Sequence, residues 1–355
     1  MAYVTRRAVR LSVPALMLTL FLFWLTRPRA PAPPPAIRYT PTLSQLPTRA
    51  PLPHSCFLFV TRTMSLTKVR RTMFDIEQRF NRRHRYPYVF LSEHPFSDEF
   101  QTNVRALASA PVRFALIDQE DWQAPAWINH ERVRGDAGFR NMVRYWAAPF
   151  AGHPQLASMR RVWRLEPGAH YTCDIAEDPF RQMSAHQWLY AFAVSLEALP
   201  TATRGLWPAA LAFLAQHPSA AQNNSLSWLA SQARFTGCQF LTNFELVDLA
   251  FIRSQPYQML FDFLDRQAGI YYDGWSDAAV RALAAAMFLA PAQVKWLHAL
   301  GYQHDALSNC PADAESQKRC HCDPAKSSHL LPMSCSARYA NATSLDIHTL
   351  LSKST

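Results

Sequence analysis

The sequence contains little glycine. Only nine of its 355 residues are Gly, and the first of them is Gly135. Neither the G-x-G-x-x-G pattern of dinucleotide-binding turns nor the G-x-x-x-x-G-K-[ST] phosphate loop occurs in the chain. The two commonest glycine-rich phosphate sites are therefore excluded. A bound nucleotide would need Arg, Lys or a metal ion to neutralise its phosphates.

Acidic residues are absent from positions 1–54, which carry seven Arg. The whole chain has a net charge of +10, so the remaining 301 residues carry only +3. Nucleic-acid-binding domains normally carry their positive charge on the folded part, so this distribution argues against a nucleic-acid partner. Apolar residues make up 49% and aromatic residues 12%, which excludes a wholly disordered chain.

The N-terminal region predicts a membrane anchor followed by a spacer. Residues 11–26 are uncharged and mostly apolar, and Arg residues flank them on both sides. This pattern favours a transmembrane signal anchor with residues 1–10 as a cytoplasmic tail and the rest of the chain lumenal. The alternative is a cleaved signal peptide, but the A-x-A site at 30–32 is followed by proline. Residues 27–54 are rich in proline and predict an extended stem.

The remainder alternates strand and helix patterns, which predicts an α/β fold with a mixed central sheet covered on both faces. No break is visible, so residues 55–325 are interpreted as one domain and 326–355 as a C-terminal tail. Apolar runs predict strands at 56–61, 88–91, 112–117, 162–165, 189–196 and 238–244, and helical spacing or caps predict helices at 69–80, 254–269, 276–289 and 291–301.

Seven cysteines are an odd number, so at least one is unpaired or bonded to another chain. A lumenal compartment permits disulfides. Cys310, Cys320, Cys322 and Cys335, together with His321, could alternatively form a zinc site. Because paired C-x-x-C spacing is absent, disulfides are the favoured interpretation.

Two glutamates follow apolar runs. Glu166 ends the run at 162–165 and precedes Pro167-Gly168, and Glu245 ends the run that starts at Cys238. A carboxylate at the end of a buried strand can hold Mg²⁺ or Mn²⁺ together with substrate phosphates. Each can equally be a surface residue at the start of a turn.

Aromatic and acidic residues alternate at 271–277, a pattern typical of sugar-binding surfaces. Asp277 also suits the first turn of a helix, where the helix dipole stabilises negative charge without any further function. His304 stands beside Asp305 and can be a metal ligand whose tautomer the acid fixes, or a structural histidine.

In this order, the segments closely resemble fungal Golgi α-1,2-mannosyltransferases, glycosyltransferase family 15, over about residues 56–324. The matching stretches are RFNRRHRYPYVFLSEHPFSDEF (79–100), VWRLEPGAHYTCDI (162–175), GLWPAALAFLAQHP (205–218), GCQFLTNFELVDLAFIRSQPYQMLFDFLDRQAGIYYDGWSDAAV (237–280), GYQHDALSNCP (301–311) and CHCDP (320–324).

The resemblance implies a GT-A-like fold, GDP-mannose as donor, Mn²⁺ as cofactor and retention of the anomeric configuration. It implies that Glu166 and His304 hold the metal. Glu245 is implied as a catalytic acid, either a nucleophile or a group that stabilises the oxocarbenium-like state. Asp277 is a second catalytic candidate.

For the donor, the resemblance implies that Arg62, Arg144 and Tyr145 lie near the nucleotide. The chain departs from the family pattern at Val143, where a Cys is usual, and at Trp146, where a polar residue or Tyr is usual. These departures concern one disulfide and the binding of the acceptor.

The sequence thus predicts a retaining α-1,2-mannosyltransferase that transfers mannose from GDP-mannose to the 2-hydroxyl of an α-mannoside on O- or N-linked glycans. Its expected location is the Golgi membrane, as a single-pass type II protein with a lumenal catalytic domain. The alternative is a lumenal mannan-binding or scaffold paralogue with lost or altered catalysis, which Trp146 and the altered 272–279 loop motivate.

Overall fold

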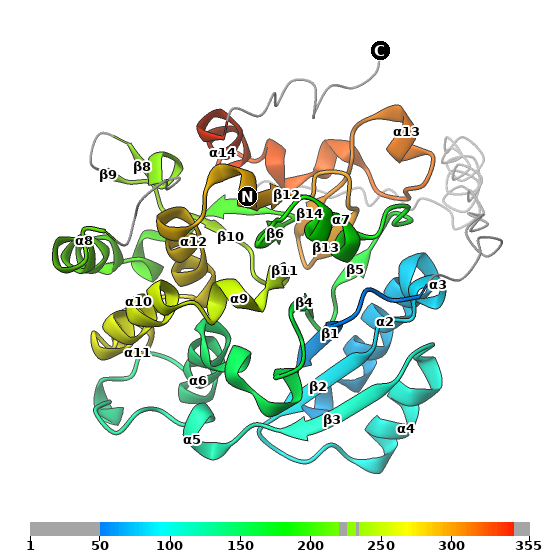
Figure 1. Cartoon of the computed structure of the whole chain (residues 1–355), viewed down its shortest axis with the longest axis horizontal. Helices are drawn as coiled ribbons and strands as arrows, with labels where there is room; N and C mark the ends of the chain where they lie inside the picture. The colour runs from blue at the N-terminus through cyan, green and yellow to red at the C-terminus, as the bar shows by residue number, and fades with distance from the viewer. Residues whose placement is uncertain (1–49, 220–225, 232–233, 344–355) are drawn as a thin grey trace, which may run out of the picture. The chain divides into compact units, whose positions relative to one another are not determined.

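A seven-stranded mixed sheet forms the centre of the fold, in the order β12-β6-β11-β4-β1-β2-β3 (Figure 1). Neighbouring strands are parallel except at β11, which is antiparallel to both β4 and β6. The prediction of a mixed sheet is therefore confirmed. The strands are β1 (Ser55–Val60), β2 (Tyr88–Ser92), β3 (Val112–Leu116), β4 (Arg161–Leu165), β6 (Tyr190–Phe192), β11 (Phe244–Asp248) and β12 (Val294–Trp296).

The computed structural model describes residues 50–219, 226–231 and 234–343. All of them belong to one compact unit. The predicted anchor at 11–26 and most of the predicted stem lie outside the described residues. Within the described ranges, no helix combines the length and apolar character needed to cross a bilayer.

Helices cover both faces of the sheet, and the alternation of side chains along β1 shows the two layers. Cys56, Leu58 and Val60 pack into one apolar core, while Phe57 and Phe59 pack into the other. The first core receives α6 (Ala137–Ala147), α8 (Leu206–Gln216), α10 (Gln255–Arg266) and α12 (Asp277–Phe288). The second receives α2 (Leu66–Ile76), α4 (Asp98–Leu107) and α7 (Pro179–Ala185). The shorter helices are α3 (Arg82–His84), α5 (Gln119–Trp122), α9 (Leu249–Ile252), α11 (Gly269–Tyr272), α13 (Ala314–Gln317) and α14 (Ser336–Ala342).

Helix α2 confirms the predicted apolar face. Val69, Met73, Ile76 and Phe80 are completely buried, and the helix continues through a π-helical turn at Glu77–Asn81. The predicted caps of α10 and α12 are also present. The Ser254 hydroxyl accepts from the backbone N–H of Tyr257, and Ser276 accepts from that of Ala279.

The predicted helix at 291–301 is wrong. A 3-10 turn at Pro291–Gln293 leads directly into β12, which pairs in parallel with β6. Val294 and Trp296 become buried in this strand, and β6 gains a partner on its second edge. The gain in burial and strand pairing outweighs the helix propensity of the Ala- and Leu-containing segment.

Three small sheets complete the described fold. One has the order β14-β13-β5, with β5 (His170–Tyr171), β13 (Tyr302–His304) and β14 (Leu307–Asn309). The others pair β7 (Ser195–Glu197) with β10 (Cys238–Phe240) and β8 (Ala230–Ser231) with β9 (Arg234–Phe235). The runs predicted as single strands at 189–196 and 238–244 are thus each divided between the central sheet and a small one.

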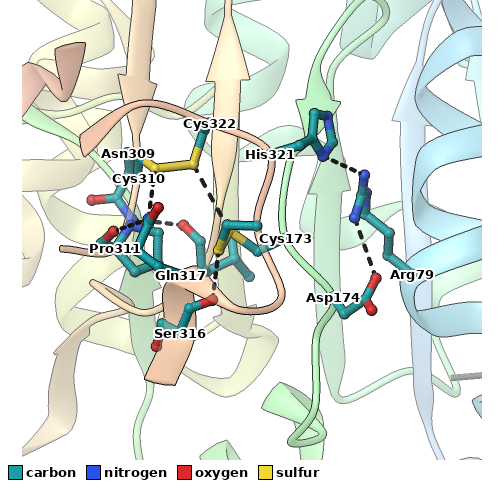
Figure 2. The surroundings of a disulfide bond; sticks show 12 residues. Arg79, Cys173, Asp174, Asn309, Cys310, Pro311, Ser316, Gln317, His321 and Cys322 are labelled. Carbon is teal, nitrogen blue, oxygen red and sulfur yellow. Dashed lines mark hydrogen bonds and ion pairs between the residues drawn. A yellow bond between two sulfur atoms is a disulfide. The ribbon is translucent and has the colours of Figure 1, made fainter. Parts of the chain in front are cut away.

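The structure contains three disulfides. Cys173–Cys320 and Cys238–Cys335 bind the C-terminal part of the chain to the earlier part, and Cys310–Cys322 closes a short loop within the C-terminal part. Two of them lie side by side, with the sulfurs of Cys173 and Cys322 3.9 Å apart (Figure 2). Disulfides are therefore confirmed over zinc. Cys56 is the free cysteine and is buried in the same apolar core as Val143.

The fold extends beyond residue 325, where the domain was predicted to end. Cys335 is bonded to Cys238, and α14 places Tyr339 in the core with 1% of its surface exposed. The Tyr339 ring contacts Phe192 edge-on, and its hydroxyl donates to the Val294 carbonyl at 2.9 Å. Residues 326–343 are thus part of the folded unit.

Candidate active site

A tight turn fixes Glu166 at the carboxyl end of β4. The backbone N–H of Ala169 donates to the Glu166 carbonyl at 3.0 Å, and Gly168 adopts a φ of +92°, which favours glycine. The Thr72 hydroxyl of α2 accepts from the Gly168 N–H and donates to the Ala169 carbonyl. This anchoring leaves the Glu166 side chain 26% exposed at the end of the strand.

The pairing of β5 with β13 brings His304 to the same place. Tyr302 lies opposite Tyr171 and Gln303 opposite His170. His304 is the next residue of β13 and is close enough to Glu166 to act on the pKa of its carboxyl. The sequence-predicted pair therefore converges, although its members are far apart in the chain.

The electrostatic surroundings of Glu166 agree with this arrangement. Burial raises the pKa of the Glu166 carboxyl, while Arg164 and then His304 act in the opposite direction. Arg164 Nη2 lies 3.4 Å from the carboxylate, and the side chain of His304 is 22% exposed with Asp305 3.4 Å from its Nδ1. A half-buried carboxylate whose pKa is raised by burial is a favourable position for a further cation.

The pair offers an incomplete metal-ligand set. Among the residues that the structure describes, no third His, Cys, Asp or Glu joins Glu166 and His304 in a ligand cluster. One carboxylate and one imidazole leave several coordination positions open. Mg²⁺ and Mn²⁺ commonly fill such positions with water and substrate phosphates, so the donor set fits a divalent ion bound together with a diphosphate.

Glu166 borders a cavity of about 360 Å³ at the carboxyl ends of β1, β2 and β4. Arg62, which follows β1, lines this cavity and is 50% exposed while it pairs with Glu93. Other hollows on the molecule are larger, but none of those described contains Glu166. The remaining lining residues are Val60, Thr61, Ser65, Lys68, Ser92, Trp122, Asp136, Gly138, Phe139, Met142 and Pro167. A cavity at the carboxyl ends of parallel strands is the usual ligand site of an open α/β sheet.

Two of the three predicted donor-binding residues do not border this cavity. Arg144 makes a bidentate ion pair with Asp265 of α10, at 2.9 to 3.1 Å. Tyr145 is completely buried, with its ring 5.7 Å from that of Trp122. Phe139 and Met142 of α6 line the cavity, whereas Tyr145 packs against Trp122, a lining residue, without lining the cavity itself.

Beneath Glu166 lies a buried network of charged residues. Arg164 Nη1 donates to Asp277 Oδ2 at 2.7 Å, and the same oxygen accepts from the Thr242 hydroxyl. Asp277 is the first residue of α12 and is 8% exposed, so it serves as an ion-pair partner at the helix N-terminus. The Trp146 indole covers the Arg164 guanidinium, whose Cζ is 3.9 Å from the ring centroid.

Glu245 lies deeper in this network than the sequence indicated. It is opposite Arg164 across the β4–β11 pair and has no exposed surface. Its Oε2 accepts from Nε of Arg281 at 3.0 Å, and Arg281 is also completely buried. Neither Arg164 nor Arg281 was predicted from the sequence as part of the site. The available signal was a charged residue inside an apolar strand in the first case and inside an Ala-rich helix in the second.

Comparison with known proteins identifies the family of the chain. The glycolipid 2-alpha-mannosyltransferase family matches residues 37–344. The O-glycoside alpha-1,2-mannosyltransferase homolog 2 of Schizosaccharomyces pombe is 33% identical over 84% of this chain and 84% of its own length. Glycolipid 2-alpha-mannosyltransferase 1 of Candida albicans is 34% identical over 80% of this chain and 70% of its own.

Two solved structures of mannosyltransferases are also similar to this chain. The mannosyltransferase Ktr4p of Saccharomyces cerevisiae in complex with GDP has a TM-score of 0.80 and 29% identity, covering 84% of each chain. Core-mannan synthase A (CmsA/Ktr4) of Aspergillus fumigatus in its Mn/GDP form has a TM-score of 0.78 and 28% identity, covering 82% of this chain and 86% of its own. The predicted resemblance is confirmed: the chain belongs to the glycolipid 2-alpha-mannosyltransferase family.

Proposed function

We propose that this chain is a retaining α-1,2-mannosyltransferase that transfers mannose from GDP-mannose to the 2-hydroxyl of an α-mannoside on O- or N-linked glycans. The observation that carries the proposal is the convergence of Glu166 and His304 beside the cavity at the ends of β1, β2 and β4. The mannosyltransferase relatives, and the GDP bound to Ktr4p, support it. They also support a GT-A-like classification of the fold.

The proposed cofactor is Mn²⁺, because the Aspergillus fumigatus enzyme was solved in a Mn/GDP form. Glu166 and His304 would hold it. When bound, a divalent ion supplies positive charge that stabilises the departing diphosphate. Arg62 and Lys68, which both line the cavity, would add positive charge on the phosphate side.

The remaining residues would shape the mannose side of the site. Arg164 holds the carboxylates of Asp277 and Glu166, so it fixes both relative to the end of β4. Full burial of Glu245, and its bond to Arg281, favour the stabilising role over the nucleophilic one. From the base of the site, the negative charge of Glu245 would stabilise the oxocarbenium-like cation. Retention of configuration would follow if the acceptor attacks on the leaving-group side.

The location remains a proposal based on the sequence. Residues 11–26 would anchor the chain in the Golgi membrane, and the domain would face the lumen. A tagged full-length chain in intact vesicles tests this orientation. An N-terminal tag should be removed by added protease, and a C-terminal tag should be protected until detergent is added.

The main test is mannose transfer by the full-length chain in detergent, with GDP-mannose, Mn²⁺ and methyl α-mannoside. Glu166→Gln should abolish Mn²⁺-dependent transfer while the protein still folds. Glu315→Gln, which changes an exposed glutamate paired only with Lys318, is the matched control and should keep full activity. Normal turnover by Glu166→Gln would contradict the assignment of Glu166 to the metal.

The second candidate function is mannan binding without catalysis. The specific observation is the Trp146 indole, which covers Arg164 where the family usually has a smaller polar side chain or Tyr. A folded wild-type chain that binds mannan and forms no product in the same assay would favour this function.

A further inference from the structure

Arg281 is a charged side chain in an apolar stretch of helix. Residues 278–287 of α12 are otherwise Ala, Val, Leu and Met, and all of them are buried. Arg281 has no exposed surface and forms an ion pair with Glu245, which also has none. Two charges buried completely in this way require specific compensation, because their removal from water costs several kcal/mol per ion.

The guanidinium is held in one orientation by partners from three elements. Nε donates to Glu245 Oε2 of β11 at 3.0 Å. Nη2 donates to the Trp146 carbonyl of α6 at 2.7 Å, and Nη1 donates to the Tyr257 hydroxyl of α10 and to the Ala147 carbonyl. Because the guanidinium fork is planar and rigid, these bonds together fix the plane in which it meets Glu245.

The fixed ion pair also determines where the second oxygen of Glu245 lies. Oε1 has no hydrogen-bond partner among the described residues, and Arg164 Nη1 is 3.9 Å from it. The Tyr190 hydroxyl of β6 is another neighbour, and its pKa is raised by burial and by the Glu245 carboxylate. Arg164 in turn contacts Asp277 at 2.7 Å and Glu166 at 3.4 Å. A continuous series of alternating charges therefore leads from Arg281 to the side chain proposed to bind the metal.

We propose that Arg281 is a positioning residue for mannose transfer. It keeps Glu245 oriented beneath Arg164, so that Glu245 and Arg164 are correctly placed toward the reacting sugar. Arg281 itself touches neither donor nor metal. This inference rests on the proposed function, and the Trp146 and Ala147 carbonyls make it specific, since they bind the guanidinium in the orientation that serves Glu245.

Steady-state kinetics on the full-length chain test the proposal. Arg281→Met should lower kcat about 100-fold, as for loss of an oriented electrostatic group, and leave the KM for GDP-mannose within about threefold. Arg281→Lys keeps the positive charge and should recover kcat to within about tenfold of wild type. In the Glu245→Gln background, adding Arg281→Met should reduce kcat by no more than about twofold, because a positioning residue acts through its partner.

Arg253 is the control. Its guanidinium binds three backbone carbonyls, those of Ala151, Leu156 and Met159, but no side chain of the candidate site, and it is exposed where Arg281 is buried. Arg253→Met should lower Tm without changing kcat of the folded protein. If Arg281→Met keeps wild-type kcat, or reduces it equally with Glu245 present and replaced, the positioning role is refuted. If Arg281→Met does not fold, the kcat of Arg281→Lys decides. A value within about tenfold of wild type supports the positioning role, and a larger loss refutes it. If the wild-type chain itself transfers no mannose, the proposed function is refuted instead.

Discussion

Ending the chain after residue 325 is expected to prevent folding, because the removed residues fill part of the core. The truncation deletes Cys335, and with it the bond to Cys238, and deletes Tyr339 of α14. Without Tyr339, the rings of Phe192 and Trp228 lose a neighbour whose centroid lies 5.0 and 5.9 Å away. The Val294 carbonyl loses its hydroxyl donor.

The expected loss can be set against the stability of a typical domain. The Cys238–Cys335 bond spans 97 residues, and chain entropy assigns about 4.7 kcal/mol to a loop of roughly this length. Removal of a large buried aromatic side chain costs about 3–5 kcal/mol. Together these losses approach the 5–15 kcal/mol or so that separates folded from unfolded domains.

Thermal unfolding of the full-length chain and of single-site variants checks this in steps. Tyr339→Phe removes only the hydroxyl and should cost about 1 kcal/mol, whereas Tyr339→Ala should cost about 3–5 kcal/mol. The paired change Cys238→Ala/Cys335→Ala isolates the disulfide. A chain ending at 325 that unfolds cooperatively at the wild-type Tm would refute the reasoning, as would equal Tm values for Tyr339→Phe and Tyr339→Ala.

Four further outcomes are expected. Cys56 should resist thiol reagents at pH 8 in the native chain and react after denaturation, because burial raises its pKa to about 12. The same shift should lower stability as the pH rises above 9.0, since the unfolded thiol ionises there and the folded one does not; a Cys56→Ala variant that keeps the loss would contradict this. Gly269→Ala should lower Tm in calorimetry, because a Cβ there would lie 2.3 Å from the Trp275 indole. Arg144→Met should destabilise the chain by about 3 kcal/mol by leaving Asp265 unpaired, yet keep the KM for GDP-mannose within about twofold; a large rise in KM would return Arg144 to the nucleotide site.

The central sheet could be predicted because its strands are fully buried. Residues 56–61 and 88–91 form short apolar runs. Such runs are typical of strands in the middle of a sheet that is covered on both faces. The segment at 291–301 shows the limit of such reasoning. Its composition suits a helix, and only the edge of β6, which is formed by residues about a hundred positions earlier, makes a strand of residues 294–296.

The candidate site shows the same limit. Burial patterns indicate that Glu166 ends a strand, but the register of β5 with β13 is what brings His304 to it. That register depends on pairing between distant segments. The sequence therefore predicted the pair of Glu166 and His304 only through the family resemblance. Arg281 was hidden for a related reason, since its partner Glu245 lies on a separate strand and a helix pattern cannot show which face meets it.

The pairing of the cysteines has a consequence for how the chain is made. Cys173 and Cys238 each find their partner only in a segment that is synthesised later, 147 and 97 residues further along the chain, at Cys320 and Cys335. During synthesis both thiols therefore stay reduced, as does that of Cys56, until these partners are made, while on the predicted topology the earlier part of the chain is already in an oxidising lumen. On the proposed lumenal topology, correct maturation of this protein would depend on isomerases that undo premature bonds, and the yield of folded protein should be sensitive to their supply.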